Sequence, residues 1–215
     1  MTANTVQEAF RLKIESFTEL TLHQFGLLLF YLLIIVFVVN IFTELYMDTH
    51  EINIKERFIM VGLGFSFGLL DMWVGDSRIF IPVWGILAYL FVVDAKYQEL
   101  PDRANLAVAI LALPVVVYSF LEPSYWNWTI LTGLFLFLFF VGISMVGALG
   151  GGDIKMMGAI GLYFPLMEVP QLLVFGFGVG VLHAVVILFK KGTNLQTKFA
   201  FGPGLIIGVL LASIF

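Results

Sequence analysis

Two aspartates, Asp94 and Asp153, stand where a membrane-spanning chain rarely carries acidic residues. Asp94 ends the apolar run FIPVWGILAYLFVVD, and Asp153 ends the glycine-rich run GALGGGD. A carboxylate at the edge of the hydrocarbon is unfavourable unless it is used, so each is a candidate functional residue. Two carboxyls held close together cannot both ionise, so they share one proton. One can then act as a base toward water while the other polarises a carbonyl, which is peptide hydrolysis without a metal or a covalent intermediate.

The residues before Asp153 and after Asp94 fit such a site. The glycines Gly150, Gly151 and Gly152 carry no side chains that would keep another backbone away from the Asp153 carboxyl. After Asp94, Pro101 favours an extended turn, and we expect Asp102 to cap a helix that restarts near residue 104.

Three further residues have both a functional and a structural interpretation. Lys155 either anchors the chain at the membrane surface or orients a carboxylate or a substrate carbonyl. Gly202 and Pro203 are interpreted as the start of a helix with proline near its first turn, in preference to substrate contacts.

Asp71, beside Trp73, is interpreted as a residue at the membrane interface.

The composition indicates an integral membrane protein. Hydrophobic residues make up 60% of the 215 residues and charged residues 12%, far from the average of soluble proteins. Cysteine is absent, which excludes disulfides, thiol nucleophiles and cysteine-ligated zinc. The three histidines lack the spacing of metal ligands, so no metal or other cofactor is expected. Membrane lipids are expected partners, and nucleic acid is not.

The apolar runs predict an all-α, polytopic membrane helix bundle with about eight transmembrane or half-spanning helices. A span needs about 20 apolar residues, and the sixth segment is the shortest. We treat the chain as one membrane domain (1–215), with an interfacial amphipathic helix over 1–24, accessory spans over 25–78 and a catalytic core over 79–215. The predicted segments are 25–44, 58–74, 79–94, 104–121, 127–148, 154–166, 169–189 and 199–215.

The positions of lysine and arginine predict the orientation. If Asp94 ends a segment that leaves the membrane, alternation puts four loops on its side, and these loops carry eight of the eleven Lys and Arg residues. By the positive-inside rule, both aspartates are expected at the cytosolic face of a multi-pass protein of the cell membrane. The four loops are 45–57, 95–103, 149–155 and 190–198.

These residues resemble the type IV prepilin peptidase and archaeal preflagellin peptidase family, the membrane aspartic peptidases with a GxGD signature. Asp94 followed by Leu100, Pro101 and Asp102 is similar to the family's aspartate and LPD pattern. The run GGGDIK, with Gly150, Gly152, Asp153 and Lys155, resembles its GGGDxK block. Phe201, Gly202 and Pro203 resemble its late FGP element. The three motifs cover residues 85–215 in the family's order.

The resemblance implies an aspartic endopeptidase that cleaves the leader of prepilin-like or preflagellin-like substrates, with Asp94 and Asp153 as the catalytic pair. Many bacterial members carry a cysteine-bearing insertion between the first two spans and also methylate the new N-terminus. The corresponding loop here, 46–57, has no cysteine. We therefore expect no methyltransferase activity.

Two alternatives remain open at this stage. Paired intramembrane carboxylates and broken helices also occur in proton-coupled transporters, but transporter sites tend to lie near the bilayer midplane between repeats. A presenilin-like intramembrane protease shares the GxGD motif. It adds a Pro-Ala-Leu element, where residues 199–205 here read FAFGPGL.

Overall fold

The computed structural model describes residues 22–46, 51–74, 79–121, 128–145, 149–191 and 200–215, and all regular structure within these ranges is helical. The predicted all-α membrane bundle is therefore confirmed. The predicted interfacial helix over 1–24 lies almost entirely outside the described residues. The helices are α2 (Leu22–Leu45), α3 (Ile54–Val74), α4 (Ile81–Tyr97), α5 (Asp102–Leu111), α6 (Leu113–Leu121), α7 (Thr129–Ser144), α8 (Gly151–Gly161), η2 (Leu166–Glu168), α9 (Val169–Leu172), η3 (Leu173–Phe177), α10 (Gly178–Lys191) and α11 (Gly202–Ile214).

Three helical stretches within the described residues are long and apolar enough to cross a membrane: Gly26–Leu45, Ile54–Val74 and Asp102–Leu121. Shorter apolar helices cover Thr129–Ser144, Leu166–Leu182 and Gly202–Ile214. The sixth predicted segment is α8, whose 11 residues measure about 16 Å at 1.5 Å per residue. That length is about half of the hydrocarbon thickness, so α8 does not cross the bilayer.

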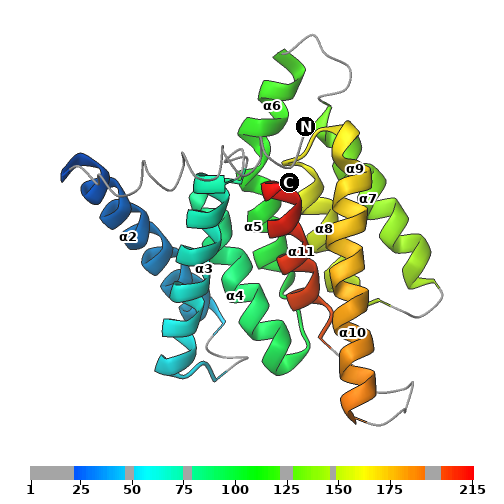
Figure 1. Ribbon diagram of the computed structural model, residues 1–215, viewed down its shortest axis with the longest axis horizontal. Coiled ribbons are helices and arrows are strands. Elements are labelled where there is room, and N and C mark those ends of the chain that lie inside the picture. The colour runs from blue at the N-terminus through cyan, green and yellow to red at the C-terminus, as the bar shows by residue number, and fades with distance from the viewer. Residues whose placement is uncertain (1–21, 47–50, 75–78, 122–127, 146–148, 192–199) are drawn as a thin grey trace, which may run out of the picture.

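Helix α4 forms the centre of the bundle. It packs against α2, α3, α5 and α11, and Trp84, Leu87, Tyr89 and Leu90 are among its fully buried side chains. In Figure 1, α2 and α3 lie on one side of α4 and α11, and α7 and α10 lie on the other. The C-terminal end of α4 and the N-terminal end of α11 point to the same side of the bundle. This arrangement brings residues near positions 94 and 202 together.

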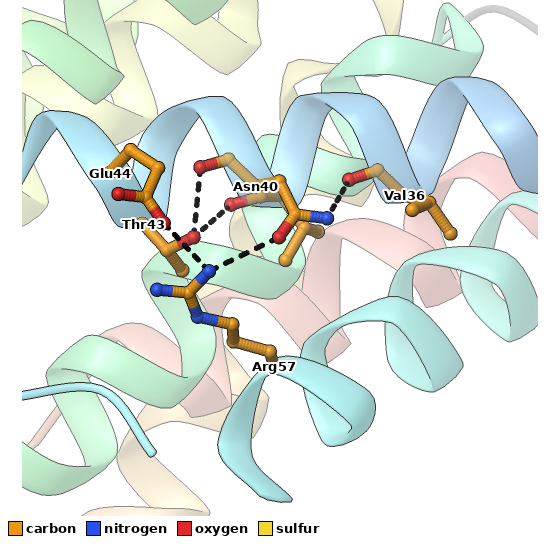
Figure 2. Close-up of polar contacts among 6 residues, drawn as sticks. Val36, Asn40, Thr43, Glu44 and Arg57 are labelled. Carbon is orange, nitrogen blue, oxygen red and sulfur yellow. Dashed lines mark hydrogen bonds and ion pairs between the residues drawn. The ribbon is translucent and has the colours of Figure 1, made fainter. Parts of the chain in front are cut away.

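Helices α2 and α3 are joined to each other by polar contacts as well as by packing. Arg57 of α3 donates through Nη1 to Glu44 Oε1 at 2.8 Å and to Asn40 Oδ1 at 3.3 Å, both on α2 (Figure 2). Asn40 in turn donates to the carbonyl of Val36 at 2.8 Å. These contacts hold α2 and α3 together at the end of the bundle where α4 finishes.

Asp71 is not an interface residue, in contrast to the prediction. Its exposed fraction is 2%, and its Oδ2 accepts a hydrogen bond from Trp84 Nε1 at 3.2 Å. The sequence suggested an interface position because Asp71 lies near the end of an apolar segment. The packing of α3 on α4 instead encloses the carboxyl and gives it the indole as donor, which a buried polar group requires.

Candidate active site

Asp94 lies in the last turn of α4 and is almost fully buried, with an exposed fraction of 5%. The helix ends at Gln98, which adopts a left-handed conformation (φ 58°, ψ 37°) and donates its N–H to the carbonyl of Asp94 at 2.9 Å. The carboxyl itself accepts a hydrogen bond through Oδ2 from the backbone N–H of Gly202 at 2.8 Å. The end of α4 and the start of α11 thus fix Asp94 from two directions.

Gly202 is the first residue of α11 and packs directly on the Asp94 carboxyl. A Cβ at position 202 would lie 2.8 Å from Oδ2 and 3.2 Å from Cγ of Asp94. Only glycine allows the N–H to approach the carboxylate so closely. Pro203 follows within the first turn of α11, which confirms the predicted helix start. The contact of Gly202 with Asp94 was not predicted.

Asp153 is the third residue of α8 and caps its own helix. Its Oδ2 accepts a hydrogen bond from the N–H of Gly150 at 3.2 Å, which is the half of a capping box that a glycine at the cap position allows. The exposed fraction of the residue is 7%, and within the described part of the chain its buried Oδ1 has no hydrogen-bond partner. The helix N-terminus stabilises a negative charge there, while the free oxygen leaves one acceptor available for a proton, a water or a substrate group.

Helix α5 packs against both α4 and α8, so the end of α4 with Asp94 and the start of α8 with Asp153 lie at the same end of the bundle. Burial, and after it the charge of Asp94, raise the pKa of the Asp153 carboxyl. Like charges in a poorly solvated site disfavour the doubly ionised pair. That the two carboxyls form a catalytic pair and share a proton stays a prediction.

Gly152 brings the segment after α4 onto the start of α8. A Cβ on Gly152 would lie 2.6 Å from Leu100 Cβ and 3.2 Å from the Leu100 carbonyl oxygen. The backbone that packs against the glycine run at Gly152 is that of Leu100. The approach of another backbone to the Asp153 carboxyl stays a prediction. Gly151, in contrast, is exposed, and a Cβ there would meet nothing within 4 Å.

Asn105 is a buried residue of this site that the sequence interpretation missed. Its Nδ2 donates to the carbonyl of Gly152 at 3.2 Å, and its Oδ1 is buried without a partner. Its exposed fraction is 3%. A polar residue one turn into an apolar helix, three positions after the LPD motif, is the signal that could have identified it.

Lys155 and Asp102 form an ion pair between α8 and α5. Lys155 Nζ lies 2.7 Å from both carboxylate oxygens of Asp102, and the side chains are 50% and 70% exposed. The prediction that Asp102 caps α5 is wrong. The helix begins at Asp102 itself, Pro101 occupies the cap position with an extended backbone (φ −60°, ψ 127°), and no side chain caps the helix. The Asp102 carboxylate binds the lysine instead.

The segment between α2 and α3 also contacts the end of α4. Lys96 pairs with Glu56 at 2.8 Å and donates to the carbonyl of Glu51, which also accepts a hydrogen bond from the Tyr97 hydroxyl at 2.7 Å. The described parts of the loops after α2, α4 and α7 therefore meet at one end of the molecule, as the predicted alternation requires. The accessory helices thus support the turn that carries Asp94.

Within the described ranges, no three His, Cys, Asp or Glu side chains gather closely enough to hold a metal ion. The functional groups of the site are the two carboxyls, the backbone N–H groups of Gly150 and Gly202, the Asn105 amide and the Asp102–Lys155 pair.

Fold and site together define the class of protein. It is a multi-pass helical membrane protein with two buried aspartates at one end, and each aspartate accepts a hydrogen bond from a glycine N–H. The model of the type IV leader peptidase family matches residues 79–188. The chain belongs to this family. The matched region contains α4, which carries Asp94, and α8, which carries Asp153, as well as α5 between them.

Two curated relatives are similar to the chain. A prepilin leader peptidase/N-methyltransferase of Legionella pneumophila is 28% identical over 157 residues, covering 68% of this chain and 48% of the relative. Another of Neisseria gonorrhoeae is 26% identical over 172 residues, covering 73% of this chain and 56% of the relative. The chain thus spans about half the length of these relatives. A comparison with solved structures gives no significant match.

Both relatives carry the name of a methyltransferase as well as that of a peptidase. The expectation that this chain lacks methyltransferase activity therefore stays a prediction.

Proposed function

We propose that the protein is a membrane aspartic endopeptidase that removes the leader peptide of prepilin-like precursors. The observation that supports this most strongly is the burial of Asp94 and Asp153 at the same end of the bundle, on two helices that both pack against α5. Membership of the type IV leader peptidase family supports the same reaction and favours it over a proton-coupled transporter or a presenilin-like protease. In this proposal residues 79–215 form the peptidase core and 25–78 the accessory spans.

The reaction requires one proton shared by the two carboxyls. The ionised carboxyl removes a proton from a water molecule, and the resulting hydroxyl attacks the carbon of the scissile carbonyl. The protonated carboxyl gives its proton to the carbonyl oxygen, which yields a neutral tetrahedral diol. On collapse, the C–N bond breaks, the nitrogen takes a proton from the first carboxyl, and the products are a carboxyl and an amine. The second carboxyl regains its proton from the new carboxyl group.

The two aspartates have different surroundings, which suggests a division of roles. Asp94 Oδ2 is held by the Gly202 N–H at 2.8 Å, and such a bond stabilises the ionised form. Asp153 also accepts a glycine N–H, at the start of α8, but at the longer distance of 3.2 Å. Within the described residues its Oδ1 has no partner, so a proton can reside on that oxygen and point at a substrate carbonyl. We assign Asp94 as the base and Asp153 as the acid of the first step.

We further propose that this end of the bundle faces the cytosol. The support is the concentration of Lys and Arg in the four loops of the predicted alternation. In the structure, Lys96 and Lys155 lie at the same end as the two aspartates. A prepilin-like precursor would then be cleaved at the cytosolic membrane boundary of the cell membrane.

The test is co-expression of the protein with pilin-like precursors from the same genome, followed by mass spectrometry of the mature N-terminus. Asp94→Asn and Asp153→Asn keep the shape of each side chain and one acceptor oxygen, and they remove the ionisable carboxyl. Each is expected to reduce cleavage by about 10²–10⁴-fold, the usual contribution of acid–base catalysis, with unchanged membrane insertion. Retained activity in either variant would remove the pair from the mechanism.

The same spectra report methylation, and cleavage in the presence of a chelator is expected to be unchanged.

A further inference from the structure

Asn105 is a buried polar residue whose presence is not explained by the stability of the bundle. It lies in α5 with an exposed fraction of 3%. Its Nδ2 donates to the carbonyl of Gly152 at 3.2 Å, and within the described residues its Oδ1 has no partner. A buried amide with one unsatisfied oxygen destabilises a fold relative to an apolar side chain of the same size. We therefore look for its role in the candidate site and not in the core.

The Asn105 side chain acts on the peptide unit that carries Asp153. The carbonyl of Gly152 and the N–H of Asp153 belong to one planar group, which extends from the Cα of residue 152 to the Cα of residue 153. A hydrogen bond to this carbonyl limits the rotation of the plane. Because the Asp153 Cα is attached to that plane, the bond also limits the direction in which the Asp153 side chain points.

The same residue is joined to the turn that follows Asp94. The backbone N–H of Asn105 donates to the carbonyl of Pro101 at 3.2 Å. Pro101 directly precedes α5 and belongs to the turn between α4 and α5. Asn105 therefore connects the two segments that carry the aspartates, through its backbone on the Asp94 side and through its side chain on the Asp153 side.

Two other contacts at the start of α8 do not replace this connection. The Gly150 N–H that binds the Asp153 carboxyl belongs to the cap of α8 itself, so it does not fix the carboxyl relative to α4. The Asp102–Lys155 pair reaches from α5 to α8, but its side chains are 70% and 50% exposed. Exposed pairs hold a geometry only weakly, whereas the Asn105 side chain is buried.

We propose that Asn105 is a positioning residue for the Asp153 carboxyl. By holding the Gly152–Asp153 peptide plane against α5, its amide sets the separation and orientation of Asp153 relative to Asp94. This inference rests on the proposed peptidase function, and it assigns Asn105 no contact with the substrate or with the reacting atoms. When the amide donor is removed, the plane is free to rotate, and the interaction between the two carboxyls weakens.

Tyr163 offers a matched control at the other end of α8. It lies just after the helix, is buried, and donates through its hydroxyl to the carbonyl of Val108 in α5 at 2.8 Å. This bond also runs from a buried side chain to a backbone carbonyl, and it also connects α5 with the α8 segment. Tyr163→Phe therefore removes a comparable hydrogen bond and leaves the Gly152–Asp153 peptide untouched.

The first experiment measures the interaction of the two carboxyls and does not require cleavage. The titration of Asp153 is followed by the infrared absorption of its protonated carboxyl in detergent, and Asp153→Asn identifies the band. Because the charge of Asp94 contributes to the raised pKa of Asp153, Asp94→Asn is expected to lower the titration midpoint. In the Asn105→Leu background this shift is expected to be less than about half as large, since the interaction weakens with distance. In the Tyr163→Phe background the full shift is expected.

Asn105→Ala is a second variant without the donor, and it is used if the leucine disturbs folding. Thermal unfolding in detergent shows which variants are folded. An undiminished shift in the folded variants that lack the donor would overturn the inference, and so would the absence of any shift in the wild-type background. An equal loss in Tyr163→Phe would also overturn it, because any buried bond between the two helices would then have the same effect.

The second experiment measures precursor cleavage as a function of pH. Asn105→Leu is expected to lower kcat by about 10- to 100-fold, as a misplaced catalytic group does. It is also expected to bring the two limbs of the kcat profile closer together, because weakly coupled carboxyls titrate at more similar pH. Tyr163→Phe is expected to keep the shape of the profile.

A loss of folded protein alone would lower the rate by the same factor at every pH. That result for Asn105→Leu would overturn the inference. If the wild type cleaves no precursor while the infrared shift still depends on Asn105, the proposed peptidase function fails and the positioning role of Asn105 stands.

Discussion

The backbone N–H of Gly202 donates a 2.8 Å hydrogen bond to Oδ2 of Asp94, which lies 108 positions earlier in the chain. This bond joins the last turn of α4 to the first turn of α11 and fixes one face of a buried carboxyl. A Cβ at position 202 would meet the same oxygen at 2.8 Å, so any side chain at this position would displace the carboxyl.

Gly202→Ala is therefore expected to displace the Asp94 carboxyl by several tenths of an ångström or more. Small displacements of a catalytic group reduce rates by up to about 10²-fold, so we expect a 10- to 100-fold loss of kcat in cleavage assays. Gly178→Ala in α10 is the control, since a Cβ there would meet nothing within 4 Å. Similar activities of the two variants would mean that the position of Asp94 does not depend on α11.

Gly152→Ala is expected to separate the start of α8 from the segment after α4. The added Cβ would lie 2.6 Å from Leu100 Cβ, and Gly152→Val would add further atoms to the same clash. Overpacking of this kind costs about 1–3 kcal/mol, which thermal unfolding in detergent can measure together with a loss of cleavage. The adjacent Gly151→Ala has open space and should retain both stability and activity. A fully active Gly152→Val would contradict the role given to this contact.

The Asp102–Lys155 pair is expected to influence catalysis more than stability. Exposed ion pairs contribute about 0–1 kcal/mol, and these side chains are 70% and 50% exposed. Lys155→Asp places two like charges side by side between α5 and α8 and should lower precursor cleavage a few-fold. The charge-swapped double variant Asp102→Lys/Lys155→Asp should restore it. No restoration would show that the lysine acts on its own, as a membrane anchor or through the substrate.

Substitutions of Gln98 are expected to change stability only through the backbone conformation at this position. Its φ of 58° is unfavourable for side chains and most unfavourable for β-branched ones. Gln98→Val should lower the unfolding midpoint and loosen the cap on the Asp94 carbonyl, whereas Gln98→Gly should match or exceed the wild type. Thermal unfolding measures the direction in which each variant shifts the midpoint. Equal midpoints would show that the left-handed conformation of residue 98 does not constrain the site.

The helices could be predicted from the sequence because apolar length is a strong signal. Each of the eight predicted segments corresponds to helical structure in the described residues, including the short α8. The break between α5 and α6 near Ala112 was missed, although Pro114 stands close to it. A proline indicates that a helix is disturbed, but it does not indicate whether the helix bends or ends at that point.

The two candidate aspartates could be selected from the sequence because a carboxylate in an apolar chain is conspicuous. The groups that hold them were harder to find, because their roles depend on contacts across the bundle. The Asn105 amide donates to the carbonyl of Gly152, 47 positions away, and the Gly202 N–H donates to the Asp94 carboxyl. The same limit explains Asp71, whose burial depends on Trp84 of the next helix. Such pairings come from tertiary packing, which no local pattern encodes.

The shortness of α8 has a consequence for the surrounding lipid. With 11 residues, this helix measures about 16 Å, against about 30 Å of acyl chains in a typical bilayer. Lipids beside a hydrophobic segment that is shorter than the bilayer tilt or compress, at a modest energy per ångström of mismatch. We therefore expect a thinner bilayer beside α8 than beside α2 and α3, and a shorter path for water from the membrane surface to the Asp153 carboxyl.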